Sequence, residues 1–299
     1  MLNLTKAFLF VTLLFSVSGR ANAEDYAARY KQLQDQHADA QVEPLLAEWR
    51  AKAPNDPEAW IASANYYFNQ RQVNISTKKA GKGDFTLTDK KTGKQAGSIS
   101  FEQDKGNMKR AADLLQEATT KFPDRLDIWC GLAFIYQENG DFESEMSILQ
   151  KMVAYAREHP AQLKWLKSEP LKDPTDKFVP EKLHNYGIYY EKKDTPGDDQ
   201  RFLKMAMFAT EQYPNHPFAY NDVALYYSNT GDRKKTREWL EKAHQVDPKD
   251  GLVMFNLGRI SAEAGNKAAA RKWYEESIKA DPEGEHVEAA KEALKKMKK

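Results

Sequence analysis

The sequence predicts an all-α protein built from stacked helix–turn–helix units, with one inserted β-hairpin. The main observation is a pattern that occurs twice within residues 217–284. Gly231-Asp232 recurs 34 residues later as Gly265-Asn266. Asp247-Pro248 recurs after the same interval as Asp281-Pro282. A fixed period of this size is typical of repeat proteins in which each unit is one pair of helices.

The last complete unit, residues 251–284, shows how each repeat forms two helices. Four residues fall at i, i+3, i+4 and i+7, the spacing of one helical face: Met254, Leu257, Gly258 and Ser261. Gly265 ends this helix and Asn266 is a suitable N-cap for the next. Pro282 ends the second helix because proline cannot continue it. Gly258 is small, so we expect the two helices to approach closely.

The two units resemble the tetratricopeptide repeat family. In one unit the resemblance rests on Met254, Leu257, Gly258, Ala270, Tyr274 and Pro282. In the other it rests on Tyr220, Ala224, Tyr227, Gly231, Ala243 and Pro248. The resemblance implies a right-handed superhelical solenoid whose first helices line a concave side. It also implies that extended or helical peptide segments bind on that side.

Residues 1–23 have the features of a secretory signal. Lys6 provides a positive start, an apolar run follows, and Ala21-Asn22-Ala23 is a small-residue cleavage site. We therefore expect cleavage after Ala23, a periplasmic or secreted protein, and no stable membrane span in the mature chain. A retained anchor is the alternative, although the apolar run is short for a span.

Composition excludes some classes of partner. Loss of Lys6 and Arg20 with the signal would leave 43 basic and 44 acidic residues, so no basic footprint for nucleic acid is present. Cys130 is the single cysteine, so the exported chain depends on packing rather than on disulfides. We expect no nucleic-acid partner and no cofactor.

Residues 24–159 read as an N-terminal sub-stack of three units. The second unit begins at Pro57, but its turn is displaced, because Pro54 and the equivalent Pro123 are 69 residues apart rather than 34. We therefore place an insertion at about 71–105, after which Gly106 is the expected turn glycine.

The insertion alternates apolar and polar residues in 85–88 and 98–101, the period of a strand. We expect a β-hairpin that lies on the helices through its apolar side chains. The insertion carries eight basic and four acidic residues. It is either a solvated, variable tip or a recognition arm for an acidic partner or an anionic surface. The candidate recognition residues are Phe85, Leu87, Lys90, Lys91, Lys94, Ile99 and Phe101.

Residues 160–182 contain four prolines and separate the two halves of the chain. We expect a short helix at 161–168 followed by an extended connection, which either acts as a hinge or packs as a fixed loop. Residues 183–284 then hold the C-terminal repeats, and 285–299 form a capping helix. The lysines at its end are solvated or make weak contact with an anionic surface.

No catalytic or metal-binding pattern is present in the sequence. None of the six histidines has a histidine or cysteine at i+3 or i+4. Phosphate-binding glycine loops and the Gly-x-Ser-x-Gly motif are also absent. We therefore expect a protein that is not an enzyme and that holds no metal.

By position in the repeat, the resemblance implies a partner-binding groove along the first helices. Amide side chains there can bond a peptide backbone, and apolar ones can form side-chain pockets. The candidate groove residues are Asn65, Phe68, Asn69, Phe134, Gln137, Asn221, Leu225, Phe255 and Arg259.

The sequence therefore predicts a protein-binding adaptor or scaffold in the bacterial periplasm, with a protein or peptide in its groove. Two alternatives stay open. One is an immunity-type or inhibitor partner of a single enzyme that uses the inserted hairpin as a plug. The other is a cell-wall or polysaccharide-associated accessory protein whose paired tyrosines stack on sugars.

Overall fold

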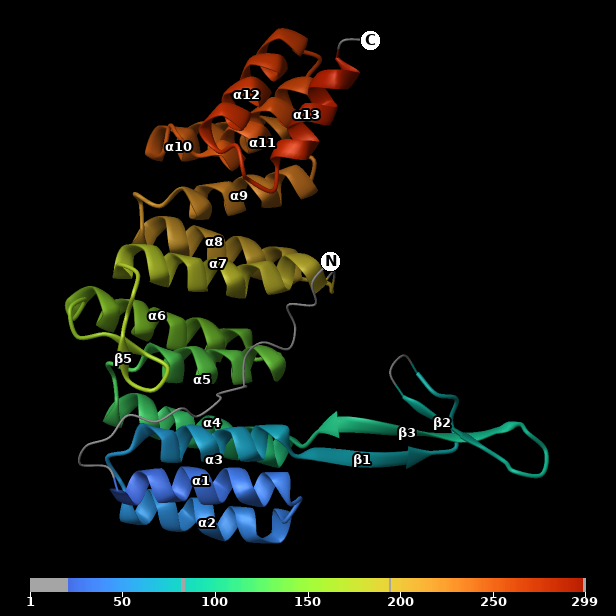
Figure 1. Cartoon of the computed structure of the whole chain (residues 1–299). Helices are drawn as coiled ribbons and strands as arrows, with labels where there is room; N and C mark the ends of the chain where they lie inside the picture. The colour runs from blue at the N-terminus through green and yellow to red at the C-terminus, as the bar shows by residue number, and fades with distance from the viewer. Residues whose placement is uncertain (1–20, 82–83, 194, 298–299) are drawn as a thin grey trace. The chain divides into compact units, whose positions relative to one another are not determined.

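A computed structural model describes residues 21–81, 84–193 and 195–297, which form thirteen helices and five short strands (Figure 1). The predicted signal lies outside these residues up to position 20, and 21–23 begin the first helix. The chain divides into two compact units. Unit 1 runs to Met152 and includes Gln162–Pro170, and unit 2 comprises Val153–Ala161 and Leu171–Lys299.

The helices of unit 1 occur in consecutive pairs, as the sequence predicts. They are α1 (Ala21–Asp35), α2 (Asp39–Lys52), α3 (Pro57–Asn69), α4 (Lys105–Lys121), α5 (Leu126–Glu138) and α6 (Phe142–Glu158), whose last residues belong to unit 2. Pro57 is at the first position of α3, where the backbone N–H that proline lacks would have no partner within the helix. Asp56 caps that helix, because its side chain accepts the backbone N–H of Glu58 at 3.1 Å.

Unit 2 continues the pairing and ends with an unpaired helix. Its helices are α7 (Thr175–Lys193), α8 (Asp198–Gln212), α9 (Pro217–Asn229), α10 (Arg233–Val246), α11 (Gly251–Glu263), α12 (Lys267–Ala280) and α13 (Val287–Lys296). The predicted boundaries of the last two repeats agree with α9–α10 and α11–α12. Helix α13 packs Ala290 against Ala270 and Tyr274 of α12.

The turns inside three repeats share one geometry, which explains the periodic glycines. Gly140, Gly231 and Gly265 have φ values of 74°, 82° and 78°, which favour glycine. At the turn between α9 and α10, the Gly231 N–H donates to the Ser228 carbonyl and the Asp232 N–H donates to the Tyr227 carbonyl. These two bonds satisfy the carbonyls at the end of the first helix.

The residue after each of these glycines starts the next helix. The Asp232 carboxylate accepts the backbone N–H of Lys235 at 3.0 Å, and the Asn266 side chain accepts that of Ala269 at 3.0 Å. Gly106 does not follow this pattern. It lies inside α4, whose cap is Asp104, so the prediction of a turn at Gly106 is wrong. The strands of the insertion join the two helices there, and no tight turn is needed.

The insertion forms a three-stranded antiparallel sheet, which we call the arm. Its strands are β1 (Arg71–Ser76), β2 (Phe85–Thr88) and β3 (Gln95–Gln103), in the order β1-β3-β2. The predicted pairing of 85–88 with 98–101 is present, with Phe85 opposite Ile99. The additional strand β1 pairs along β3 from Arg71–Gln103 to Ser76–Ser98.

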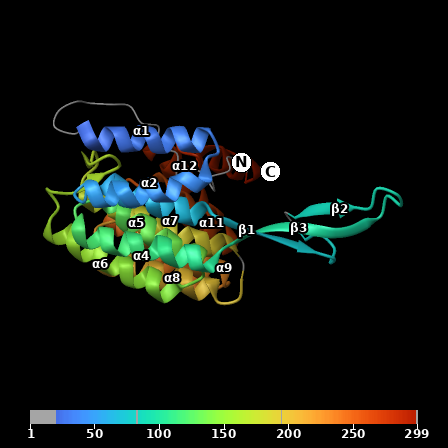
Figure 2. The same cartoon turned by 90° about the horizontal axis from the view of Figure 1, so that it is seen from below.

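The arm does not lie on the helices, contrary to the expectation. Both views show it extending away from the ends of α3 and α4 (Figures 1 and 2). Phe85 and Phe101, two of the residues expected to pack on the stack, are 63% and 55% exposed. The reason is geometric, because β1 and β3 follow directly from the ends of two adjacent helices and continue outward.

The segment 162–170 forms a short β-hairpin with a turn at 166–168, so the predicted helix at 161–168 is wrong. Its strands are β4 (Lys164–Trp165) and β5 (Glu169–Pro170). The backbone N–H of Lys164 donates to the Asp124 carbonyl at 2.7 Å, and its Nζ lies 2.6 Å from Asp124 Oδ2. These contacts fix the hairpin to the residues before α5. Helix α7 also starts at Thr175, so 175–182 are not part of an extended connection.

Small residues form the centre of unit 2, as the repeat pattern predicts. Ala224 of α9 and Ala243 of α10 are buried with Leu240 and Leu257 in one apolar cluster. A Cβ placed on Gly258 would lie 2.7 Å from Cδ1 and Cε1 of the Tyr274 ring. Helices α11 and α12 are therefore in such close contact that glycine is needed at this position.

Candidate partner-binding surfaces

In unit 1, two of the predicted groove residues are buried. Phe68 is 7% exposed and its ring lies 5.6 Å from that of Phe134. Gln137 is 4% exposed and donates from Nε2 to Glu145 Oε1 at 2.7 Å. Packing between neighbouring helices occupies both side chains. This corrects their assignment to a partner-binding surface.

The other predicted groove residues of unit 1 are more accessible. Asn65 and Phe134 are half-buried, and Asn69 is exposed at the end of α3. Cys130, on the same helix as Phe134, is fully buried with Sγ 3.8 Å from Met152 Sδ. The thiol is thus part of the core. The role of Asn65, Asn69 and Phe134 in binding stays a prediction.

In unit 2, the predicted groove residues are half-buried, and two of them are hydrogen-bonded to a neighbouring helix. Asn256 donates from Nδ2 to Asn221 Oδ1 at 2.9 Å, which joins α11 to α9. Arg259 donates to Ser228 Oγ and to Glu263 Oε1, both at 3.2 Å. Leu225 of α9 adds an apolar, half-buried side chain. The role of these residues in binding stays a prediction.

Phe255 differs from the other candidates because its ring packs inside unit 2. It lies 5.7 Å from the Tyr274 ring and 5.8 Å from the imidazole of His286. Phe255 is therefore half-buried, and α12 and the residue before α13 both contact its ring. Its role in binding stays a prediction.

A cavity of about 450 Å³ lies in unit 2 at the ends of α7 and α9. Its lining residues come from α7, α8, α9 and the loop between α7 and α8: Tyr190, Glu191, Thr195, Pro196, Gly197, Asp199, Phe202, Tyr226, Asn229 and Thr230. None of the nine candidate groove residues lines it. The sequence signal for this site was the two Tyr-Tyr pairs at 189–190 and 226–227, each of which contributes one ring, Tyr190 and Tyr226.

The cavity combines aromatic rings with acidic groups. Glu191 Oε1 accepts a hydrogen bond from Asn229 Nδ2 at 3.2 Å, and the hydroxyl of Tyr226 accepts one from Gln200 Nε2 at 2.6 Å. Among the lining residues named above, Glu191 and Asp199 are carboxylates and no side chain is cationic. The site therefore suits a ligand that presents a basic or amide group beside apolar carbon.

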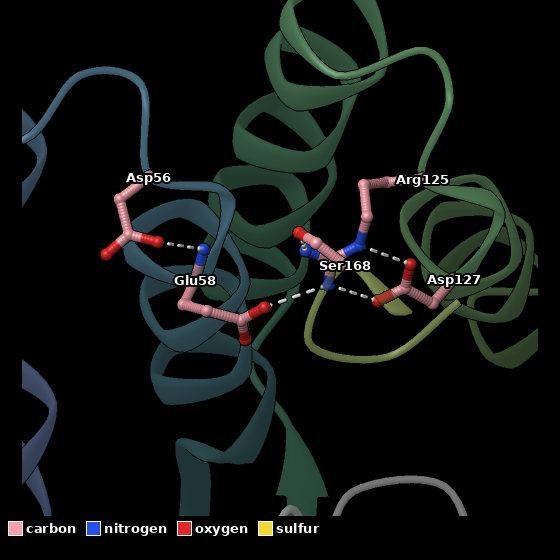
Figure 3. Close-up of polar contacts among 5 residues, drawn as sticks. All are labelled: Asp56, Glu58, Arg125, Asp127 and Ser168. Carbon is pink, nitrogen blue, oxygen red and sulfur yellow. Dashed lines mark hydrogen bonds and ion pairs between the residues drawn. The ribbon is translucent and has the colours of Figure 1, made fainter. Parts of the chain in front are cut away.

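Arg125 is a deeply buried cation of unit 1, only 1% exposed (Figure 3). Its Nε and Nη2 donate to Asp127 at 2.8 and 2.7 Å, and Nη2 also donates to Glu58 Oε1 at 2.9 Å. Nη1 donates to Ser168 Oγ at 2.9 Å. Burial raises the pKa of Glu58, and Arg125 opposes that shift. The cluster joins α3, α5 and the 162–170 segment, so we interpret it as structural.

A second buried pair joins α7 to α9 in unit 2. His184 Nδ1 lies 2.9 and 2.8 Å from the two carboxylate oxygens of Asp222, which is 2% exposed. Burial favours the neutral imidazole, but the hydrogen bond and charge of Asp222 outweigh it and raise the pKa of His184. The rings of His184 and Phe218 are 5.7 Å apart, and no nucleophile completes a catalytic arrangement in the described contacts.

This pair predicts a pH-dependent stability of unit 2. Because the folded pKa is raised above about 6.5, the stabilisation is complete below that pH and is lost as pH rises through the folded pKa. We expect roughly 0.5–1 kcal/mol, since the exposed part of the ring is screened. Urea unfolding between pH 6 and 9 measures it. His184→Gln should abolish this slope, and an unchanged slope would contradict the assignment.

Within the described part of the chain, no group of three or more His, Cys, Asp or Glu side chains is placed to hold a metal ion. Among the described helices, none combines the length and apolar character that crossing a bilayer requires.

Comparison with known families agrees with the repeat architecture. Tetratricopeptide repeat models match residues 103–168 and 234–285. The chain is therefore a tetratricopeptide-repeat protein, a class whose fold serves as a scaffold for protein–protein interaction. A search of curated proteins found no match.

Solved structures similar to this chain include other tetratricopeptide-repeat proteins. YrrB, described as having an unusual peptide-binding site, is 12% identical, with 83% of this chain and 97% of YrrB covered and a TM-score of 0.40. PilW, a type IV pilus biogenesis factor, is 13% identical, with coverages of 91% and 99% and a TM-score of 0.40. The tetratricopeptide-repeat domain of Sgt2 from Aspergillus fumigatus is 25% identical, with 40% of this chain and 76% of that domain covered and a TM-score of 0.36. TM-scores below 0.5 carry no argument about function.

Proposed function

We propose that this protein is an adaptor of the bacterial periplasm that binds a segment of another protein through unit 2. The observation that carries the proposal is the cavity at the ends of α7 and α9. Tyrosine rings line it together with the carboxylates of Glu191 and Asp199. The bound segment presents a basic side chain, whose charge the two carboxylates neutralise and whose alkyl part packs on the rings. The periplasmic location rests on the signal-like residues 1–23.

The tyrosines favour protein binding over sugar binding. Cations lie over the rings of four of the six paired tyrosines. Lys193 Nζ is 4.7 Å from the Tyr189 ring centre, Lys235 Nζ is 4.7 Å from that of Tyr227, and the Arg201 guanidinium is 5.8 Å from that of Tyr190. The Arg110 guanidinium is 5.5 Å from the Tyr67 ring. A sugar that stacks on these rings would have to displace the cations, which disfavours the polysaccharide alternative.

Neutralising the cavity carboxylates should weaken partner capture. We expect Glu191→Gln combined with Asp199→Asn to reduce capture about tenfold, because charge-assisted hydrogen bonds to a basic group are lost. The partner is first trapped in intact cells with a photo-crosslinking residue at Asn229, which lines the cavity. Capture by the two proteins is then compared at equal concentration.

The matched controls lie on the second helices of the repeats. A crosslinker at the exposed Glu275 of α12 should not trap the same protein. Glu238→Gln combined with Glu275→Gln changes charge equally and should leave capture unchanged. Capture that is insensitive to the cavity substitutions, or identical crosslinks from both positions, would reject the cavity as the binding site.

A further inference from the structure

The arm has two chemically different faces. Residues directly opposite each other in an antiparallel sheet point to the same side. Val73 is opposite Phe101, Ile75 and Phe85 are both opposite Ile99, and Leu87 is opposite Gly97. One face therefore carries six apolar side chains, which we call the apolar face: Val73, Ile75, Phe85, Leu87, Ile99 and Phe101. The register places Gln72, Asn74, Thr86, Ser98, Ser100 and Glu102 on the other.

The apolar face is largely open to solvent. Val73, Ile75, Phe85 and Phe101 are 53%, 73%, 63% and 55% exposed. The rings of Phe85 and Phe101 contact each other edge to face at 5.8 Å, so the side chains form one continuous patch. The helices of unit 1 do not cover it, because the arm extends away from them (Figure 2). A continuous exposed patch of this kind marks an interaction surface.

Lysines flank the apolar face at the outer ends of the strands. Lys78 and Lys79 follow β1, and the β2–β3 turn holds Lys90, Lys91 and Lys94, all exposed. None of these five makes an ion pair with another described residue. The lysine ammonium groups are therefore available to an external anion.

The acidic residues near these lysines are engaged in the turns. Asp89 Oδ1 accepts the backbone N–H groups of Lys91 and Thr92 at 2.9 and 2.7 Å, and these bonds lower the pKa of Asp89. Asp84 Oδ2 accepts the N–H of Gly81 at 2.7 Å. The segment 71–105 has eight basic and four acidic residues, whereas the net charge of the whole chain is +1. Positive charge is thus concentrated on the arm.

We propose that the apolar face of the arm docks on the surface of a lipid bilayer that contains anionic headgroups. The six apolar side chains enter the boundary between headgroups and acyl chains, and the lysines contact the lipid phosphates. The attraction of each lysine to such a surface falls off within a Debye length and is therefore weakened by salt. The apolar part of the binding follows the area removed from water.

The composition of the arm favours a bilayer over a protein partner. Protein interfaces are enriched in aromatic residues, Met and Arg and depleted in Lys, whereas lysines beside an apolar surface are typical of segments that bind anionic membranes. The six side chains of the apolar face are hydrocarbons, and the five cations at the outer ends of the strands are lysines. Arg71 and Gln103 lie on the same side of the sheet at its inner end, next to the helices. Face-to-face pairing of two copies would bring together two positively charged arms, which repel each other. The proposal does not depend on the cavity of unit 2.

Vesicle binding tests the proposal with the chain from Glu24 onward, so that the apolar N-terminal segment contributes nothing. The probes are vesicles of phosphatidylcholine alone and with about one third phosphatidylglycerol, compared by co-sedimentation. We expect binding to the anionic vesicles that weakens as salt is raised. Ile75→Thr/Phe85→Thr/Phe101→Thr should reduce binding on the order of tenfold or more. Threonine keeps a good strand former at each position.

A charge variant and a matched control complete the design. Lys90→Gln/Lys91→Gln/Lys94→Gln should reduce binding several-fold and flatten its salt dependence. Asn74→Thr/Ser100→Thr alters the polar face and should bind as the unchanged protein does. Circular dichroism should show the same helix content for every variant, because the arm packs on no helix.

Several outcomes would overturn the proposal. Absence of binding to anionic vesicles would do so, as would equal binding to neutral and anionic vesicles. A dimer in solution that the threonine variant converts to a monomer would show that a second copy covers the face. Crosslinks from Phe85 to one protein in intact cells, without vesicle binding, would favour the inhibitor alternative.

Discussion

Replacing Arg125 with methionine should destabilise unit 1 by about 3–5 kcal/mol, the usual cost of breaking a buried ion pair. Methionine retains much of the side-chain volume but leaves the Asp127 and Glu58 carboxylates without their cation. The Asp127 side chain is 7% exposed, so water cannot replace the lost bonds. Urea unfolding gives the free-energy change, and hydrogen exchange of peptides from α3 and α5 assigns it to unit 1.

Two further variants separate loss of the pair from loss of packing. Arg125→Met with Asp127→Asn and Glu58→Gln should recover part of the stability, because no unpaired charge then stays buried. Lys109→Met removes the exposed ion pair between Lys109 Nζ and Asp113 Oδ2, which are 2.7 Å apart. This substitution should lower the free energy of unfolding by less than about 0.5 kcal/mol. If Arg125→Met costs no more than this surface control, the cluster is not a structural centre.

Gly258→Ala should destabilise unit 2 by about 1–3 kcal/mol, although alanine is the better helix former. The added Cβ would lie 2.7 Å from two atoms of the Tyr274 ring, which is 4% exposed and packed on Ala270 and Ala290. The ring cannot move without displacing α12 or α13. Thermal unfolding and hydrogen exchange of α11 and α12 would measure the effect.

Gly131→Ala is the matched control, since Gly131 is also inside a first helix. There the new Cβ meets Leu115 Cδ1 at 3.1 Å, the end of a flexible side chain. We expect a small change, with the gain in helix propensity offsetting the contact. Tyr274→Leu should reduce the cost of Gly258→Ala in the double variant. A Gly258→Ala protein as stable as the original would refute close helix packing at this site.

Local sequence signals were sufficient for the repeats and for two of the three strands of the arm. Gly231 and Gly265 predicted turns because few other residues adopt positive φ, and both have it. Alternation in 85–88 and 98–101 predicted two paired strands, and β2 and β3 do pair, with Phe85 opposite Ile99. The strand at 71–76 was missed because Arg71 and Gln72 at its start do not alternate with apolar residues.

The candidate site could be predicted only in part. Position in the repeat correctly located residues on first helices, but burial depends on the neighbouring helix. Phe68 and Phe134 meet across α3 and α5, and Gln137 meets Glu145 of α6. The cavity was missed because its lining comes from three helices and a loop, and only their packing brings Glu191, Asp199 and Tyr226 together.

The sequence alone determined the helical-repeat class, because periodic small residues, turn glycines and caps act within a few positions of each other. Contacts between distant residues required the tertiary structure. Arg125 meets Ser168 and Glu58 across separations of 43 and 67 residues, and no local pattern marks such partners. The exposure of the arm is decided in the same way. Alternation shows that a strand has an apolar side, but only the direction in which β1 and β3 leave α3 and α4 determines that this side faces solvent.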